Sequence, residues 1–342
     1  MLRRIILSVA LSCSGWAQVQ PGMWTFSNRP YFDPLHAEPR AAQTQVLFPA
    51  VSTGFPFAVK NGRHMAWDVN LGKELPIFGW ETRRIEDVDG VGPGQFGIGV
   101  WFPLSFHIVE DMGKDPSNPI LNTDYRFGGM VKGQFGLWAK KGPAQRTTAG
   151  FRFHFGHEST HIGDEFTLGA LREHKDFLRV NVSYEFWDLA GSLEPKFGCD
   201  GEWVLKLRGG MVRVIDQKKG WYSSELLHPY PSTRTLLPSK RNYEPYFGLE
   251  FGKTSDKPGL FTSIDLRNRT VYDYAKTNPA ASEDAQLSVN WLVGWKQGPP
   301  GQGVLGKIRP AYFIRIYHGV NPAGQFRSQR DYTLIGFGVQ FF

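Results

Sequence analysis

The stretch QLSVNWLVGW, residues 286–295, changes between apolar and polar side chains at nearly every position. One face would carry Leu287, Val289, Trp291, Val293 and Trp295, and the other Ser288 and Asn290. A period of two residues is the repeat of a β-strand, because successive side chains of a strand point to opposite faces. The same alternation recurs in residues 96–102, 178–186, 260–266 and 335–341. The sequence therefore predicts an all-β fold.

The faces opposite the apolar ones carry many charges of both signs. They comprise Arg152, Glu158, Arg179, Glu185, Lys206, Arg208, Glu250, Asp265, Arg267, Arg269, Arg309 and Arg315. A membrane-spanning barrel turns its apolar face to lipid and fills its lumen with polar groups. We therefore predict a transmembrane antiparallel β-barrel of about 12 strands, whose lumen holds an ion-pair network.

The N-terminal residues have the layout of a secretory signal peptide. Arg3 and Arg4 precede the apolar run IILSVAL, and small residues follow up to Gly15 and Ala17. This layout predicts cleavage after Ala17 and a single barrel domain over residues 18–342. Cys199 is then the sole remaining cysteine, which excludes an internal disulfide.

The composition excludes two other classes of protein. No stretch after the N-terminus has the run of about 18 apolar residues that a transmembrane helix needs. The formal net charge of +7 comes from scattered basic residues. No basic tract interleaved with aromatic residues is present, so nucleic acid is not an expected partner.

The last strand, DYTLIGFGVQFF, ends on Phe342. It resembles the terminal strand that bacterial outer-membrane barrels present to their assembly machinery. This resemblance implies a location in the bacterial outer membrane and the barrel-assembly machinery as a partner. If the strand runs toward the periplasm, short turns and long loops should alternate. The short turns would lie near 140–146 and 253–258, and the long loops near 107–124, 160–176, 216–244, 272–284 and 319–331.

The stretch FRFHFGHESTHIGDEF, residues 151–166, extends an outward row of phenylalanines into His157, Ser159 and His161. At the outer end of a strand these polar side chains would lie at the membrane rim. An unpaired polar group in an apolar environment costs about 1–3 kcal/mol, so their presence needs a reason. A histidine beside a serine can serve as the base that activates a hydroxyl nucleophile.

His-x-Ser on the membrane-facing rim of a barrel is similar to the motif of outer-membrane phospholipase A and the lipid A 3-O-deacylases. The resemblance implies that His157 is a general base, that Ser159 is a nucleophile and that outer-membrane lipids are substrates. Thr160 stands where the phospholipase has Asn. Asp164, Glu165 or Glu158 would have to orient His157, because the alternation places Glu185 and Asn181 in the lumen, with Tyr184 and Phe186 toward lipid.

A longer resemblance covers most of the mature chain. The stretches at 120–129, 151–166, 179–185 and 314–326 are similar, in that order, to an uncharacterised family of bacterial outer-membrane barrels. That family has a His-x-Ser-Ser-His-x-Gly-Asp-Glu signature, in which Thr160 here replaces a serine. The resemblance implies fold and location and assigns no activity.

Three other interpretations of these residues remain open. His161, Asp164 and Glu165, with His157, could bind Zn²⁺ through the imidazoles or Ca²⁺ through the carboxylates. The histidines could instead be structural groups of the rim. A lumen rich in Arg and Lys could conduct small anions, or the long loops could bind an external partner.

Overall fold

The structure is a computed structural model. It describes residues 23–25, 31–53, 63–82, 94–112, 119–139, 146–161, 163, 178–199, 201–223, 243–254, 257–271, 284–298, 309–327 and 329–341. The predicted signal peptide, Asp164, Glu165 and Phe342 lie outside these ranges.

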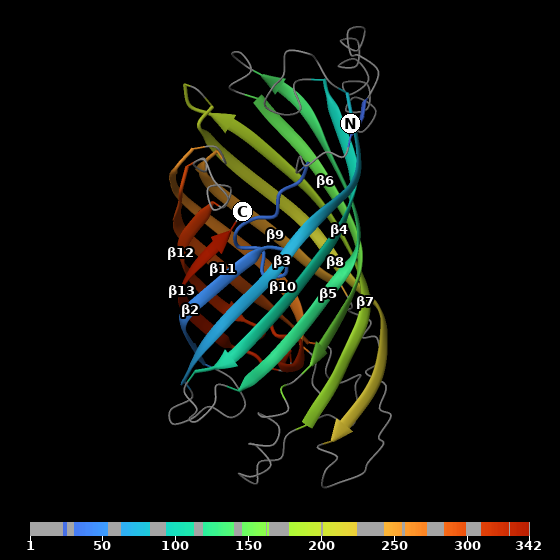
Figure 1. Ribbon diagram of the computed structural model, residues 1–342, viewed down its shortest axis with the longest axis vertical. Helices are drawn as coiled ribbons and strands as arrows, with labels where there is room; N and C mark the ends of the chain where they lie inside the picture. Colours follow the sequence, from blue (N-terminus) through green and yellow to red (C-terminus); the bar gives the residue numbers. More distant parts are fainter. Residues whose placement is uncertain are drawn as a thin grey trace.

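The described residues form one antiparallel barrel (Figure 1). Its strands are β2 (Thr44–Thr53), β3 (Arg63–Glu81), β4 (Phe96–Asp111), β5 (Ile120–Ala139), β6 (Arg146–His161), β7 (Leu178–Phe197), β8 (Trp203–Ser223), β9 (Tyr243–Lys253), β10 (Gly259–Val271), β11 (Asp284–Lys296), β12 (Pro310–Gly319) and β13 (Tyr332–Phe341). Each strand pairs with the next, and β13 pairs with β2 to close the ring. A short strand, β1 (Met23–Thr25), pairs with the end of β3. The prediction of a transmembrane barrel of about 12 strands is confirmed.

The two ends of the barrel differ in their connections. Residues 140–145, 198–202 and 254–258 connect strands at one end, which we call the short-turn end. Residues 162–177, 224–242 and 272–283 connect strands at the opposite, long-loop end. The predicted short and long connections alternate in the middle of the chain, but residues 82–95 and 297–309 are long connections at the short-turn end, and residues 54–62 and 112–119 are shorter ones at the long-loop end. Strands β4, β5 and β8 also extend further than the loop prediction allowed.

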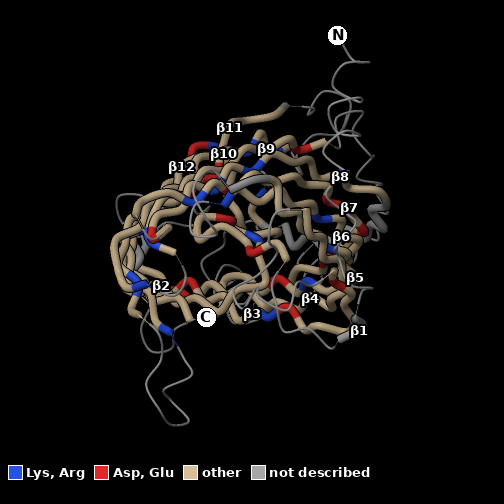
Figure 2. Tube along the Cα trace, turned by 90° about the horizontal axis from the view of Figure 1, so that it is seen from above, with Lys and Arg blue, Asp and Glu red and all other residues tan. Residues whose placement is uncertain are grey.

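The outer wall is apolar and the inner wall is charged. Phe155, Trp295 and Phe337 are 49%, 47% and 49% exposed on the outside, where a membrane would cover them with lipid. Arg208 and Asp265 are buried on the inside, and Figure 2 shows charges of both signs around the wall. Among the described residues, no helix is long and apolar enough to span a membrane.

On β7 the inward and outward faces are the reverse of the sequence prediction. Tyr184 and Phe186 are only 5% and 1% exposed and lie in the lumen, so Ser183 and Glu185 face outward. The physical reason is that Phe32, inside the barrel, packs in one buried cluster with Tyr184 and Phe186. An aromatic residue inside the lumen gives the inner face of β7 an apolar partner, which an open polar lumen would not provide.

Residues 31–43 run inside the barrel before β2, and we call this segment the plug. Glu38 pairs with Arg152 at 2.7 Å and with Arg208 at 2.9 Å. Arg40 pairs with Asp124 at 2.6 Å. Burial alone would raise the pKa of Glu38, but the charges of Arg152 and Arg208 outweigh burial and hold it well below its usual range. The plug is therefore held to the wall by buried ion pairs.

The connection between β12 and β13 also enters the lumen. It contains a single 3₁₀ turn, η5 (Gly324–Phe326), and the Gly324 amide donates to the Asp124 carboxylate at 3.2 Å. Arg40 of the plug donates to the Pro322 carbonyl, and Arg327 pairs with Glu244. The plug and this connection thus meet at Asp124 inside the barrel.

Glu38→Gln should loosen the plug. The substitution leaves Arg208 without its carboxylate partner, and breaking a buried pair in this way costs about 3–5 kcal/mol. Amide hydrogen exchange at Ala37, whose N–H donates to the Ser263 hydroxyl at 3.0 Å, should accelerate accordingly. As a control, Glu202→Gln removes a half-exposed pair with Lys253 at 3.9 Å and should change exchange little. Unchanged protection in Glu38→Gln would mean that other contacts hold the plug.

Candidate functional site

The polar cluster at the long-loop end of β6 lies on the outside of the barrel, as predicted. Phe153 and Phe155 are exposed, and His157, Ser159 and His161 follow on the same face. The intervening residues are buried in the lumen. His157 therefore stands at the end of the outward apolar row of β6.

His157 bridges two side chains of the neighbouring strand β7. Its Nδ1 lies 3.3 Å from Glu185 Oε1, and its Nε2 lies 3.3 Å from Ser183 Oγ. The backbone register explains the contact, because His157 pairs directly with Glu185 and Ser159 with Ser183. The side chains of His157 and Glu185 are 28% and 36% exposed, so the outer side of the group is accessible.

The three side chains can form one chain of hydrogen bonds. A carboxylate only accepts hydrogen bonds, so in that chain Nδ1 of His157 is the atom that donates to Glu185. Nε2 is then an acceptor, and the Ser183 hydroxyl donates to it. This is the order of contacts that a serine, a general base and an orienting acid require.

A register shift lies next to the group, on the neighbouring strand. Glu185 pairs with Asp216 and Phe186 with Val214, so the extra residue is Ile215 of β8. Bulges of this kind are frequent beside active sites.

Ser159, the serine of the predicted pair, has a different partner. Its hydroxyl lies 3.2 Å from Nε2 of His161, and the His161 ring packs edge-on against Tyr125 at 5.5 Å between centroids. The rim thus holds two serine–histidine pairs side by side. In only one of them does a contact join the histidine to a carboxylate in the described part of the chain.

The structure describes one of the three acids that the sequence offered to orient His157. Glu158 is buried in the lumen and pairs with Arg40 at 3.3 Å, so it faces away from His157. Asp164 and Glu165 lie outside the described residues, so their roles as orienting acids or metal ligands with His161 stay predictions. Within the described residues, no three His, Cys, Asp or Glu side chains form a group that could hold a metal ion.

Sequence reasoning missed Ser183 and Glu185. Both residues stand two apart in the run VNVSYE, so the signal was a Ser-x-Glu pair on one face of a strand. The alternation was read with the wrong face outward, and a shift of one residue exchanges the two faces of a strand.

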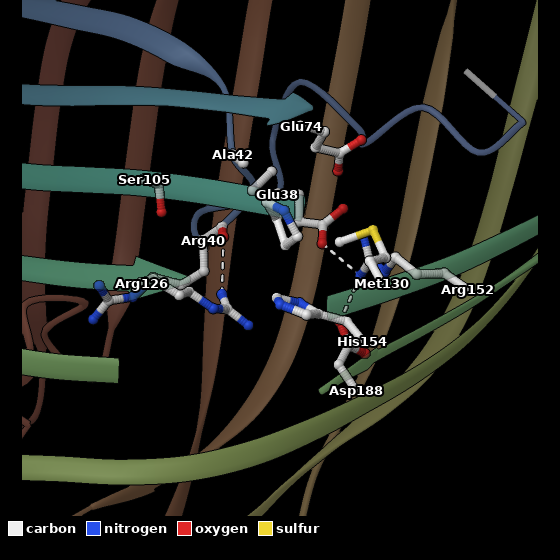
Figure 3. A pocket seen from close by; sticks show the side chains of 12 residues that line it. Glu38, Arg40, Ala42, Glu74, Ser105, Arg126, Met130, Arg152, His154 and Asp188 are labelled. Carbon is white, nitrogen blue, oxygen red and sulfur yellow. Dashed lines mark hydrogen bonds and ion pairs between the residues drawn. The ribbon is translucent and has the colours of Figure 1, made fainter. Parts of the chain in front are cut away.

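A pocket lies in the lumen beside the plug (Figure 3). It is lined by Glu38, Arg40, Ala41, Ala42, Glu74, Pro103, Ser105, Arg126, Met130, Arg152, His154 and Asp188. Charged side chains of both signs line it together with apolar ones. It is separated from the outer cluster because inward and outward residues alternate along β6.

The fold and the outward cluster define a transmembrane β-barrel with a polar group on its lipid-facing rim. No family model matches the chain, and no curated protein does. Among solved structures, outer membrane phospholipase A from Escherichia coli has 11% sequence identity and a TM-score of 0.44, covering 92% of this chain and 95% of its own. The autotransporter NalP translocator domain from Neisseria meningitidis has 10% identity and a TM-score of 0.38, covering 87% and 85%. The CymD monoaromatic hydrocarbon channel has 8% identity and a TM-score of 0.39, covering 87% of each chain.

Proposed function

We propose that this protein is a lipid ester hydrolase of the bacterial outer membrane, with its active site on the outer rim of the barrel. Ser183 is the nucleophile, His157 the general base and Glu185 the residue that orients His157. The single observation that carries the proposal is the position of the His157 ring, which bridges Glu185 and Ser183 at 3.3 Å each.

The reaction proceeds in two steps. Ser183 Oγ attacks the ester carbonyl carbon while its proton moves to Nε2 of His157, and Glu185 stabilises the imidazolium. His157 then returns the proton to the departing alcohol oxygen, which leaves an acyl group on Ser183. A water molecule, deprotonated by His157, attacks the carbonyl carbon of this acyl-enzyme, and His157 returns that proton to Ser183 Oγ as the bond to the fatty acid breaks.

The position of the group on the outside of the barrel suits a lipid substrate. Acyl chains can lie along the apolar row of Phe153 and Phe155 while an ester near the headgroup reaches Ser183. A soluble substrate would gain nothing from this row.

The anion-channel alternative receives less support from the structure. The plug and the β12–β13 connection occupy the lumen, and the luminal cations Arg152, Arg208 and Arg327 are paired with carboxylates. Paired cations attract mobile anions weakly.

The test is release of fatty acid from phospholipid and from lipopolysaccharide by the refolded protein. Ca²⁺ is added in one arm and chelated in another, because Asp164 and Glu165 are predicted ligands. A serine-reactive fluorophosphonate should label Ser183, and peptide mapping identifies the site. Labelling of Ser159 would transfer the nucleophile's role to the Ser159–His161 pair. Absence of both hydrolysis and labelling in all arms would refute the proposal.

A further inference from the structure

Three side chains that can donate hydrogen bonds form a row across the outer wall, next to the proposed active site. Trp187 of β7 pairs in register with Arg213 of β8, and Arg213 pairs with Tyr243 of β9. The row lies on the outer face, because Arg213 and Tyr243 are exposed, whereas the valines on either side of Arg213 are buried. We call these three residues the donor row.

The guanidinium of Arg213 has an aromatic neighbour but no carboxylate partner in the described part of the chain. Its central carbon lies 5.0 Å from the centroid of the Tyr243 ring, which is a cation–π contact. Among the described residues, no hydrogen bond or ion pair joins the side chains of the donor row to another side chain. Glu185, two residues from Trp187 on the same face of β7, contacts His157 instead. The donor row therefore offers donors to a group from outside the protein.

The donor row lies where the wall ends at the long-loop end. Tyr243 is the first residue of β9, and its pair with Arg213 is the last one between β8 and β9 in that direction. Toward the short-turn end the same outer face is apolar, with Leu189 and Phe247 exposed. Tryptophan and tyrosine are common at a membrane interface, but an arginine on the lipid-facing wall is unfavourable without an interface or an anion. A lipid on this wall would place its acyl chains on the apolar face and its headgroup at the donor row.

We propose that the donor row binds the phosphate group of a membrane lipid. A phosphate presents several anionic acceptor oxygens, and the planar guanidinium of Arg213 can donate to two of them at once. Neighbouring strands are about 4.8 Å apart, so the indole N–H of Trp187 and the hydroxyl of Tyr243 stand next to a phosphate held by Arg213. Both groups can donate to its remaining oxygens.

The direct experiment measures the binding of single lipids to the full protein in a non-ionic detergent by native mass spectrometry. The probes are phosphatidylglycerol with ether-linked chains and the matching dialkylglycerol, which carries no phosphate. An ester hydrolase cannot cleave ether-linked chains, so the result does not depend on the proposed activity. The wild type should bind the phospholipid at least about tenfold more tightly, because hydrogen bonds to a charged group are strong. Equal affinities for the two lipids would overturn the proposal.

Variants of the donor row locate the site. Arg213→Gln should remove the preference for the phospholipid, and Tyr243→Phe, which keeps the ring beside the guanidinium, should weaken it about threefold. Lys253→Gln is the matched control, because Lys253 is an outward cation 4.0 Å from the centroid of the Trp203 ring but lies at the short-turn end. This variant should keep the preference. An unchanged preference in a folded Arg213→Gln protein would refute the assignment to the donor row.

A second arm identifies the source of the phosphate. Lipid A, with and without its phosphates, is measured on the Ser183→Ala variant, because its ester-linked chains are possible substrates of the wild type. Tighter binding of phosphorylated lipid A than of phosphatidylglycerol would assign the site to lipopolysaccharide, and the reverse order would assign it to a glycerophospholipid. Inorganic phosphate is added as a competitor. Displacement of both lipids by an equal concentration of inorganic phosphate would contradict a lipid site, because the acyl chains would then contribute nothing.

Discussion

His157→Ala should reduce lipid ester hydrolysis by about 10⁶-fold, because loss of the base leaves the Ser183 hydroxyl without an acceptor for its proton. The histidine also protonates the leaving alcohol, so both halves of the reaction depend on it. The measurement is the rate of fatty acid release from mixed micelles, together with the rate of fluorophosphonate labelling at Ser183.

Two further variants separate the members of the proposed group. Ser183→Ala should lose activity as completely as His157→Ala. When residues act together, removal of any one of them costs nearly as much activity as removal of both. Glu185→Gln keeps the shape of the side chain but no longer holds His157 in the required tautomer, and a loss of roughly 10³-fold or more is expected. Ser159→Ala should retain most of the activity, because its hydroxyl bonds to His161.

His318→Ala is the matched control. His318 also faces outward at the long-loop end, where it bonds to Thr333 at 2.9 Å, but it lies on β12 and far from β6 in the strand order. This variant should keep full activity. Each variant must show the heat-modifiable mobility of a folded barrel. Full activity of a folded His157→Ala protein would refute the assignment of the base.

The fold could be predicted from the sequence because the outward face is uniform over most strands. On β11, Leu287, Trp291 and Trp295 all face outward, with Ser288 and Asn290 buried inside. Lipid accepts only apolar side chains along the whole band, so the alternation carries through each strand. The same reasoning placed His157 and Ser159 on the outside correctly.

The sequence could not show which face of β7 points outward, because an alternating pattern defines two faces of a strand without showing which one meets lipid. Tyr184 and Phe186 are apolar as lipid-facing residues are, yet they pack against Phe32 of the plug in the lumen. Glu185 is charged as luminal residues are, yet it faces outward to His157. Both the apolar residues and the charged residue of β7 therefore lie on the face opposite to the one that their polarity predicts.

The plug itself has no periodic pattern in the sequence. Its run YFDPLHAEPRAAQ contains two prolines and mixed charges, which is typical of a loop. The partners that bury it are remote, since Glu38 pairs with Arg152 and Arg208 and His36 with Glu250. Only the closed barrel brings these residues together, so pattern reasoning along the chain could not find them.

Removal of the plug should convert the closed barrel into an ion-conducting one. A protein whose mature chain begins at Ala42 lacks the residues that cross the lumen but keeps every strand from β2 to β13. Barrels of about eight strands are filled by their own side chains and those of about 16 leave an open channel, so a barrel of this size needs additional material to close it. Conductance in planar bilayers should rise at least about tenfold above that of the wild type, whose lumen is filled.

Loss of Glu38 frees Arg208 and one side of Arg152, and loss of Arg40 frees Asp124 and Glu158. The open lumen then carries unpaired charges of both signs, so the current should show little preference between anions and cations. The Glu38→Gln variant is the intermediate case and should show brief openings, since the remaining contacts of Arg40 and His36 still hold the plug. A truncated barrel that folds and stays silent would show that the β12–β13 connection, through Arg327 and Gly324, closes the lumen without the plug.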